Sequence, residues 1–125
     1  MKDINDLTHE IIGCAMRVHS ELGNGFQEVI YQRALSIELN NSNIGHDREK
    51  EITIEYKGQI IGSRRADFLV ENRVMVEIKA LETLLKVHKA QAINYLEAYK
   101  ITDGLLLNFG ATKLEFNRVY NSNLK

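Results

Sequence analysis

The side chains best suited to chemistry lie close together in the sequence, at Asp67 and in the triplet Glu77-Ile78-Lys79. Val74 to Lys79 is an apolar run interrupted by these charges, which is typical of a β-strand. Side chains alternate across a strand, so Glu77 and Lys79 would share one face, roughly 6.5–7 Å apart along its axis. The turn-like residues 71–73 would fold this strand back on the preceding one and bring Asp67 beside Glu77.

Two converging carboxylates repel each other unless they share a proton or bind a divalent cation. Mg²⁺ suits such a pair, because it prefers oxygen ligands and often uses one or two carboxylates together with waters and substrate phosphates. Such a cation, Mg²⁺ or Mn²⁺, would polarise a phosphodiester and lower the pKa of a bound water. Lys79 would orient that water or stabilise the developing charge. The residue types therefore predict metal-assisted phosphodiester hydrolysis.

A second Glu-x-Lys triplet, Glu55-Tyr56-Lys57, serves as an internal comparison. It ends a strand-like segment beside a glycine turn, and no Asp precedes it on a hairpin strand, so we interpret it as a charge pair on an edge strand. For Asp67, Glu77 and Lys79 the alternative is a salt bridge between neighbouring strands.

Hydrophobic periodicity predicts the elements that must position these side chains. Helices are expected over residues 4–22, 26–39 and 83–100, and strands over residues 51–56, 60–70, 74–79, 105–109 and 113–120. Short connections predict that the first three strands form an antiparallel meander, with an irregularity near Gly62. The almost wholly apolar segment 105–109 suits a strand buried on both faces. We expect one α/β domain over residues 1–125, with a mixed central sheet flanked by helices.

Each predicted helix has an expected packing face. The expected apolar stripes are Ile4, Leu7, Ile11, Ala15, Val18 and Leu22 in the first helix, Phe26, Ile30, Ala34 and Ile37 in the second, and Val87, Ala90, Ile93 or Asn94, and Ala98 in the third. On the third helix, His88, Gln91 and Tyr95 would form a separate polar stripe. Glu28, at the start of the second helix, would either add a third carboxylate to the site or face water.

Composition restricts the class of protein. The chain of 125 residues is long enough for one domain, is 44% hydrophobic and 26% charged, and has no apolar stretch near the ~20 residues that span a bilayer. Its start lacks a secretory signal and its single cysteine, Cys14, excludes an internal disulfide, so we expect a cytoplasmic protein without membrane contact. Net charge is −1, but residues 57–100 hold eight Lys/Arg against five Asp/Glu, which is compatible with a face that meets a polyanion.

Several motifs in order resemble a known family. The segment Gly25-Phe26-Gln27-Glu28-Val29-Ile30-Tyr31 fits the signature of the GxxExxY proteins, which are assigned to the PD-(D/E)XK nuclease superfamily. It is followed by Arg65-Ala66-Asp67, then Glu77-Ile78-Lys79, then His88 and Gln91. The likeness extends from the first helix to about Tyr120, and Ala66 stands where the superfamily's name places proline.

The resemblance implies a restriction-endonuclease-like αβββαβ core. It also implies that Asp67 and Glu77 are metal ligands and Lys79 the catalytic lysine, while Glu28 matches the superfamily's helical acidic residue and Gln91 the polar residue of the following helix. The expected partner is DNA or RNA, with phosphate contacts from the basic residues that flank the set in sequence: Arg64, Arg65, Lys86, His88 and Lys89.

Two other functions remain open. One is a nucleic-acid-binding module that keeps the fold without turnover, and the other is a protein-interaction or structural domain in which Asp67, Glu77 and Lys79 form only a buried ionic network. A homodimer is a further expectation, because the first helix and the last strand could offer apolar surface.

Overall fold

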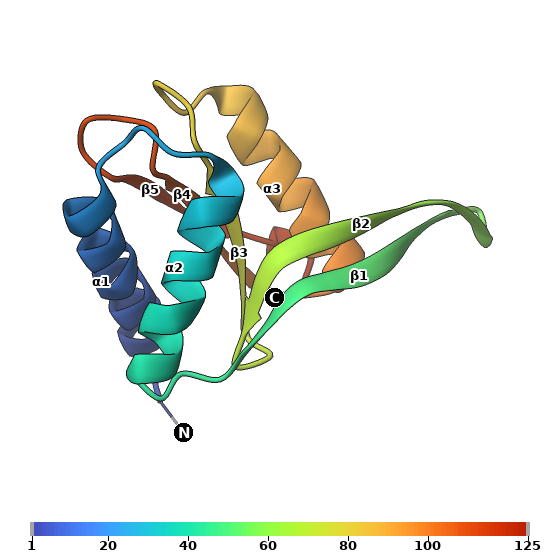
Figure 1. Cartoon of the computed structure of the whole chain (residues 1–125). Coiled ribbons are helices and arrows are strands. Elements are labelled where there is room, and N and C mark those ends of the chain that lie inside the picture. Colours follow the sequence, from blue (N-terminus) through green and yellow to red (C-terminus); the bar gives the residue numbers. More distant parts are fainter. Residues whose placement is uncertain (1, 125) are drawn as a thin grey trace.

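The computed structural model describes residues 2–124, which form three helices, five strands and a short terminal turn of 3₁₀ helix (Figure 1). Their order is α1 (Ile4–Leu22), α2 (Glu28–Asn41), β1 (His46–Tyr56), β2 (Gln59–Val70), β3 (Val74–Lys79), α3 (Lys86–Tyr99), β4 (Asp103–Asn108), β5 (Glu115–Tyr120) and the 3₁₀ helix (Ser122–Leu124). The predicted α/β fold and its order of helices and strands are confirmed.

The five strands form one mixed sheet in the order β1-β2-β3-β4-β5. Strands β3 and β4 are parallel and the other neighbours are antiparallel, so the predicted meander of the first three strands is confirmed. A parallel pair needs a crossover connection, and α3 supplies it between β3 and β4.

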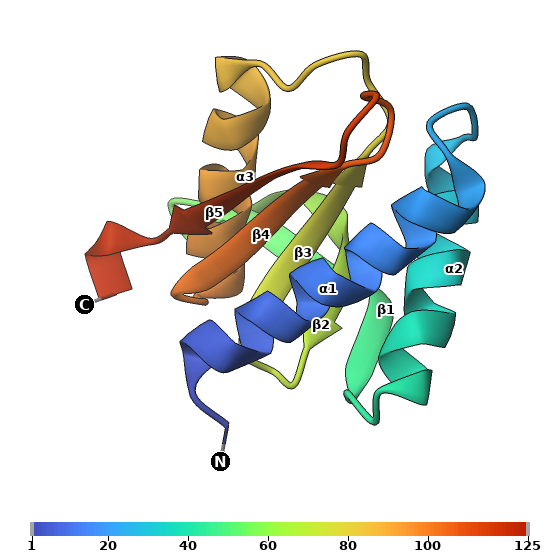
Figure 2. The same cartoon turned by 90° about the vertical axis from the view of Figure 1, so that its left-hand side faces the viewer.

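Helices cover both faces of the sheet: α1 and α2 lie on one and α3 lies on the other (Figure 2). The larger core cluster joins α1 and α2 to residues that include Phe68, Val76 and Leu107, and the smaller one joins α3 to Met75 and Val119. Residues 104–108 of β4 are all buried, as expected for a strand covered on both sides. The core therefore lies on both sides of β3 and β4.

The expected packing face of α1 is confirmed, but those of α2 and α3 are right only in part: Ala34 and Ile93 pack against the core, whereas other expected residues are exposed. Helix α2 buries Tyr31, Leu35 and Leu39, whereas Phe26 and Ile37 are 49% and 60% exposed. Both sets have helical spacing, and the buried set is the one whose Tyr31 stacks on Phe109. Helix α3 likewise buries Ala92 and Leu96 and leaves Val87 and Ala90 exposed, and it begins at Lys86 rather than at residue 83.

Strands β1 and β2 continue beyond the sheet as a two-stranded arm (Figure 1). Only residues 68–70 of β2 pair with β3, whereas β1 pairs along almost the whole of β2. Strand β1 begins at His46, five residues before the predicted start. The early start comes from pairing with β2, where His46 lies opposite Val70, because the charged sequence of this part of β1 has no strand pattern. The irregularity expected near Gly62 is present as a register shift that leaves Ile61 unpaired.

Within residues 2–124, no helix combines the length and apolar character that crossing a membrane requires.

Candidate functional site

The turn before α2 sets the position of Glu28. Tyr31 is fully buried and stacks on Phe109, with ring centroids 4.7 Å apart and planes 12° from parallel. Its hydroxyl donates to the carbonyl of Gly23 at 2.6 Å and accepts from the amide of Phe26 at 3.0 Å. Tyr31 thus holds the turn from which α2 starts, and Glu28 is the first residue of that helix.

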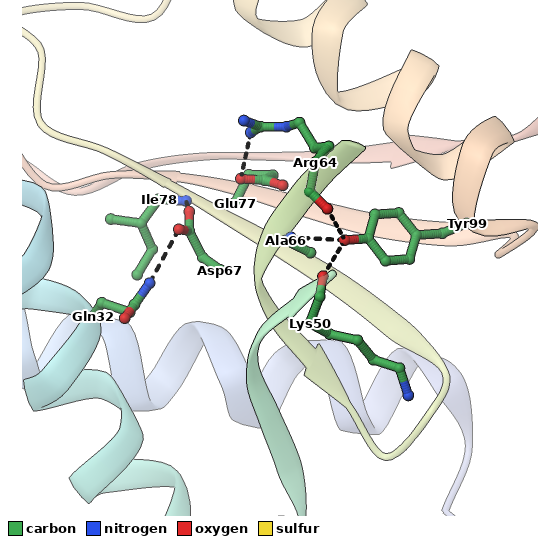
Figure 3. Close-up of polar contacts among 8 residues, drawn as sticks. All are labelled: Gln32, Lys50, Arg64, Ala66, Asp67, Glu77, Ile78 and Tyr99. Atoms are coloured by element: carbon green, nitrogen blue, oxygen red, sulfur yellow. Dashed lines mark hydrogen bonds and ion pairs between the residues drawn. The ribbon is translucent and has the colours of Figure 1, made fainter. Parts of the chain in front are cut away.

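Asp67 lies at the point where β2 separates from β3 (Figure 3). Its Oδ2 accepts from the backbone amide of Ile78 at 2.7 Å, and its Oδ1 accepts from Nε2 of Gln32 at 3.1 Å. The amide of Ala66 donates to the hydroxyl of Tyr99 at 2.7 Å instead of to β3. The Asp67 carboxylate and the Tyr99 hydroxyl therefore replace the regular ladder where the two strands part.

Gln32 is a site residue that the sequence analysis missed. It is 5% exposed, and its Oε1 accepts from a guanidinium nitrogen of Arg48 at 2.8 Å. This contact orients the amide, so that Nε2 faces Asp67. The available signal was its spacing of four residues from Glu28, which places both on one side of α2.

Glu77 is the most deeply buried carboxylate of the site, at 3% exposure. Burial is the main cause that raises the pKa of Glu77, to about 8, and the negative charge of Asp67 raises it further than Arg64 and Lys79 lower it. Oε2 accepts from Arg64 at 3.4 Å, but Oε1 has no hydrogen-bond partner among residues 2–124. Asp67 and Glu77 are close enough for the charge of Asp67 to raise the pKa of Glu77.

Arg64 lies between Glu77 and α3. Its guanidinium carbon is 3.9 Å from the centroid of the Tyr95 ring, which is a close cation–π contact. The Nε atom is buried and, within the described chain, has no hydrogen-bond partner. Tyr95 belonged to the polar stripe expected on the third helix, but its role as a platform for Arg64 was not predicted.

Lys79 and Glu28 complete the group of charges. Partial burial raises the pKa of the Glu28 carboxyl, and the positive charge of Lys79 opposes this shift more strongly than any other group does. Asp67 raises the pKa of Glu28 further. The same ammonium lowers the pKa of Glu77. Asp67 and Lys79 are therefore close enough to act on both glutamates of the site, Glu28 and Glu77.

The segment after Lys79 is held by the end of β4. The side chain of Asn108 accepts from the amide of Leu81 at 2.8 Å and donates to its carbonyl at 2.9 Å. A Cβ on Gly110 would lie only 2.4 Å from the amide nitrogen of Leu81, so this close approach requires glycine. The amide of Phe109 also donates to the carbonyl of Lys79 at 2.9 Å.

The other residues expected at the site lie on the surface or make local contacts. Gln91, Lys86 and Lys89 are exposed. Arg65 is exposed and contacts Glu51 at 3.5 Å. His88 accepts from the amide of Leu85 at 3.0 Å and so supports the start of α3. The structure thus groups Glu28, Arg64, Asp67, Glu77 and Lys79, while it leaves these five residues outside that group.

The carboxylate pair is compatible with a magnesium-type cation. No group of three or more His, Cys, Asp and Glu side chains in residues 2–124 is arranged to hold a metal ion. Mg²⁺, however, is commonly held by one or two carboxylates while waters and phosphate oxygens fill the other positions. The unpartnered Oε1 of Glu77 beside Asp67 meets that requirement.

Comparisons with known proteins identify a family and a fold. The model of a family described as the PD-(D/E)XK nuclease superfamily matches residues 5–119. No curated protein is significantly similar to this chain. A solved structure titled "Crystal structure of SSO0001" is similar with a TM-score of 0.59 and 23% identity, over 74% of this chain and 50% of that one. At this identity the likeness shows the fold alone, and the match spans about half of that chain's length.

Proposed function

Because this chain belongs to the PD-(D/E)XK nuclease superfamily, we propose that it is a magnesium-dependent nuclease that hydrolyses phosphodiester bonds of DNA or RNA. The observation that carries the proposal is the pair formed by half-buried Asp67 and buried Glu77, with Lys79 close to it and one Glu77 oxygen left without a hydrogen-bond partner in residues 2–124. Two carboxylates and a lysine in that arrangement are the groups that metal-assisted hydrolysis uses.

Asp67 and Glu77 would hold the cation. Glu28 was expected as a third ligand, but the three carboxylates are not arranged as a metal site in residues 2–124, so Glu28 would contribute negative charge from the start of α2. Mg²⁺ or Mn²⁺ at this position would supply Lewis-acid polarisation of the scissile phosphate. Gln32 and the amide of Ile78 hold the Asp67 carboxylate by one hydrogen bond to each oxygen, so the ligand is oriented before any ion arrives.

Lys79 would act on the substrate. A lysine ammonium can stabilise the negative charge that develops on the phosphate oxygens and can hold the attacking water by a hydrogen bond. Its segment is fixed by the contact between the carbonyl of Lys79 and the amide of Phe109. Gln91 is proposed as a further polar residue of the site on the basis of the motif order alone.

The substrate's phosphates would meet the basic residues around this group. Arg64 is at the site itself, and the exposed residues proposed for phosphate contacts are Arg65, Lys86 and Lys89, together with half-buried His88. These contacts would be local, since the chain as a whole carries a net charge of −1.

Within the superfamily, we propose that the chain is one of the GxxExxY proteins. The segment Gly25 to Tyr31 matches that signature, and it places exposed Glu28 at the first position of α2 and buried Tyr31 three residues later. This arrangement gives the motif a physical basis, because the tyrosine holds the turn and the glutamate faces the charges of Asp67 and Lys79.

A cleavage assay tests the proposal. Single- and double-stranded DNA and RNA would be incubated with the protein and Mg²⁺ or Mn²⁺. Cleavage is expected for the wild type and should be lost in Asp67→Ala and Lys79→Ala, whereas Glu55→Ala, in the second Glu-x-Lys triplet, should retain it. Equal activity in all variants would indicate a contaminating nuclease and contradict the proposal.

A homodimer is a weaker proposal, which rests on exposed apolar side chains. Met16 of α1 is 48% exposed, and Phe116 and Tyr120 of β5 are 42% and 52% exposed. Met16 also lines an apolar groove between α1 and α2 with Ile37. Sedimentation of the purified protein at several concentrations would detect the dimer, and a monomer throughout would contradict it.

A further inference from the structure

The contact between Arg64 and Glu77 is a single, long hydrogen bond. Arginine pairs best with a carboxylate through two parallel hydrogen bonds at about 2.7–2.9 Å. Here one guanidinium nitrogen reaches one carboxylate oxygen at 3.4 Å. Oε1 of Glu77 and Nε of Arg64 are both buried, and neither has a hydrogen-bond partner in the part of the chain described. Each partner therefore retains bonding capacity that a different ligand could use.

Arg64 is held at this place from its other side. The face of the Tyr95 ring lies 3.9 Å from the guanidinium carbon, and Tyr95 is fixed on α3, which packs on the sheet through Ala92 and Leu96. The position of the Arg64 guanidinium therefore depends on the contact with Tyr95 as well as on the hydrogen bond to Glu77. The arginine is half-buried and sits at the base of the arm, next to exposed Arg65.

A divalent cation on Glu77 would face this guanidinium at short range. Like charges that share a partly desolvated site repel strongly, because the effective dielectric constant is lower there than in water. The ion would also bind the Glu77 carboxylate and so replace the hydrogen bond from Arg64 to Oε2. Binding of the cation and the inward position of Arg64 thus oppose each other.

We propose that Arg64 stands in for the cation at Glu77 in the metal-free protein and is displaced by it to bind a phosphate of the nucleic acid. This inference rests on the proposed nuclease function. Guanidinium groups bind phosphate by paired hydrogen bonds, so a displaced Arg64 gains a new partner when substrate is present. Metal and nucleic acid then increase each other's affinity by the same factor, as linkage requires.

Calorimetric titration of Mn²⁺ in the absence of nucleic acid tests this role. Arg64→Gln keeps a polar side chain but removes the charge, and we expect it to bind Mn²⁺ at least about fivefold more tightly than the wild type, which is the lower end of typical coupling between sites. Arg17→Gln is the matched control: its side chain is exposed and contacts Glu38 rather than Glu77, so its Mn²⁺ affinity should equal that of the wild type.

A second variant covers the case in which Arg64→Gln does not fold. Tyr95→Leu leaves both charges in place but removes the ring that holds the guanidinium, so it should also bind Mn²⁺ more tightly, by a smaller factor. Equal or weaker Mn²⁺ binding in the folded variants would overturn the role of Arg64 and leave the proposed nuclease intact. Absence of Mn²⁺ binding in the wild type and in every variant would overturn both proposals.

Discussion

The pKa of Glu77 is well above that of an ordinary surface carboxylate. Burial is the first cause and the charge of Asp67 the second, and together they raise its pKa from 4.5 to about 8. At neutral pH the metal-free folded protein therefore favours the protonated form of Glu77. A bound cation would favour the ionised form. Burial therefore keeps Glu77 protonated without metal, and metal binding would release this proton.

This pKa predicts how the stability of the metal-free protein changes with pH. Between about 4.5 and about 8 the folded state holds a proton on Glu77 that the unfolded state has lost, so the free energy of unfolding should fall as pH rises through this range. Urea unfolding in EDTA at several pH values measures this. Glu77→Gln is the control and should lack this part of the pH dependence. A wild-type protein that gains stability relative to Glu77→Gln over the same range would contradict the prediction.

Gln32 gives a second prediction for a single residue. Gln32→Leu removes one hydrogen bond to Asp67 and the partner of Arg48, so Asp67 loses part of its orientation. Loss of such a supporting contact typically lowers metal affinity by about 10–100-fold. Calorimetric Mn²⁺ titration should show this loss for Gln32→Leu and none for Gln59→Leu at the exposed tip of the arm. Unchanged Mn²⁺ affinity in Gln32→Leu would show that the hydrogen bond from Gln32 to Asp67 does not contribute to metal binding.

The separation of β2 from β3 creates the place where the site forms. On the N-terminal side of Phe68, β2 no longer pairs with β3, and two backbone amides have side-chain acceptors instead. The amide of Ile78 donates to the Asp67 carboxylate, and the amide of Ala66 donates to the Tyr99 hydroxyl. The Tyr99 hydroxyl also contacts the carbonyl of Lys50, so α3 is joined to both strands of the arm (Figure 3). In a regular sheet these backbone groups would pair between the strands, and the amide of Ile78 would not be free to donate to Asp67.

The close approach of Gly110 to the segment after Lys79 predicts a strong effect of a small substitution. In Gly110→Ala, the added methyl group would lie 2.4–2.5 Å from backbone atoms of Ala80 and Leu81, so the backbone must move. We expect a loss of about 1–3 kcal/mol in the free energy of unfolding, measured by urea denaturation. Gly62→Ala is the control because its methyl group would meet no atom within 4 Å. Equal stability of the two variants would contradict the prediction.

Elements were predictable from the sequence where their local pattern is unambiguous. The stripe of α1 and the apolar run of β4 each admit one interpretation, and the structure confirms both. Helix α2 carries two sets of apolar residues with helical spacing, and only contact with Phe109 and the sheet decides that Tyr31 rather than Phe26 is buried. The first half of β1 has no strand pattern of its own, since pairing with β2 alone makes it a strand.

The candidate site shows the same division. The proximity of Asp67 to Glu77 could be predicted from sequence because a short hairpin connects their strands. Strand alternation also predicts that Glu77 and Lys79 lie on the same face of their strand. Gln32 and Arg48 escaped prediction because their contact joins α2 to β1 across 16 positions of sequence. The contact of Arg64 with Tyr95 depends on how α3 crosses the sheet, and the residue pattern predicted the inward face of that helix only in part.

For the molecule as a whole, the proposed function would depend on charges near the site rather than on the net charge of the protein. The net charge is −1, so long-range attraction to nucleic acid would be weak and the basic residues near the site would have to supply it. The arm adds a separate feature: Tyr56, Ile60 and Ile61 near its tip are 60–67% exposed. The site lies at the base of this arm, where α2, β2 and β3 meet (Figure 1).

The central claim is that Lys79 beside the Asp67 and Glu77 pair performs phosphodiester hydrolysis. The most direct test is the single-turnover cleavage rate of Lys79→Ala compared with Lys57→Ala, the equivalent change in the second Glu-x-Lys triplet, with saturating Mg²⁺ and with folding checked by circular dichroism. We predict that Lys79→Ala cleaves about 10²–10³-fold more slowly, as expected for loss of one electrostatic stabiliser, and that Lys57→Ala cleaves at the wild-type rate. Cleavage by folded Lys79→Ala at the wild-type rate would contradict the claim.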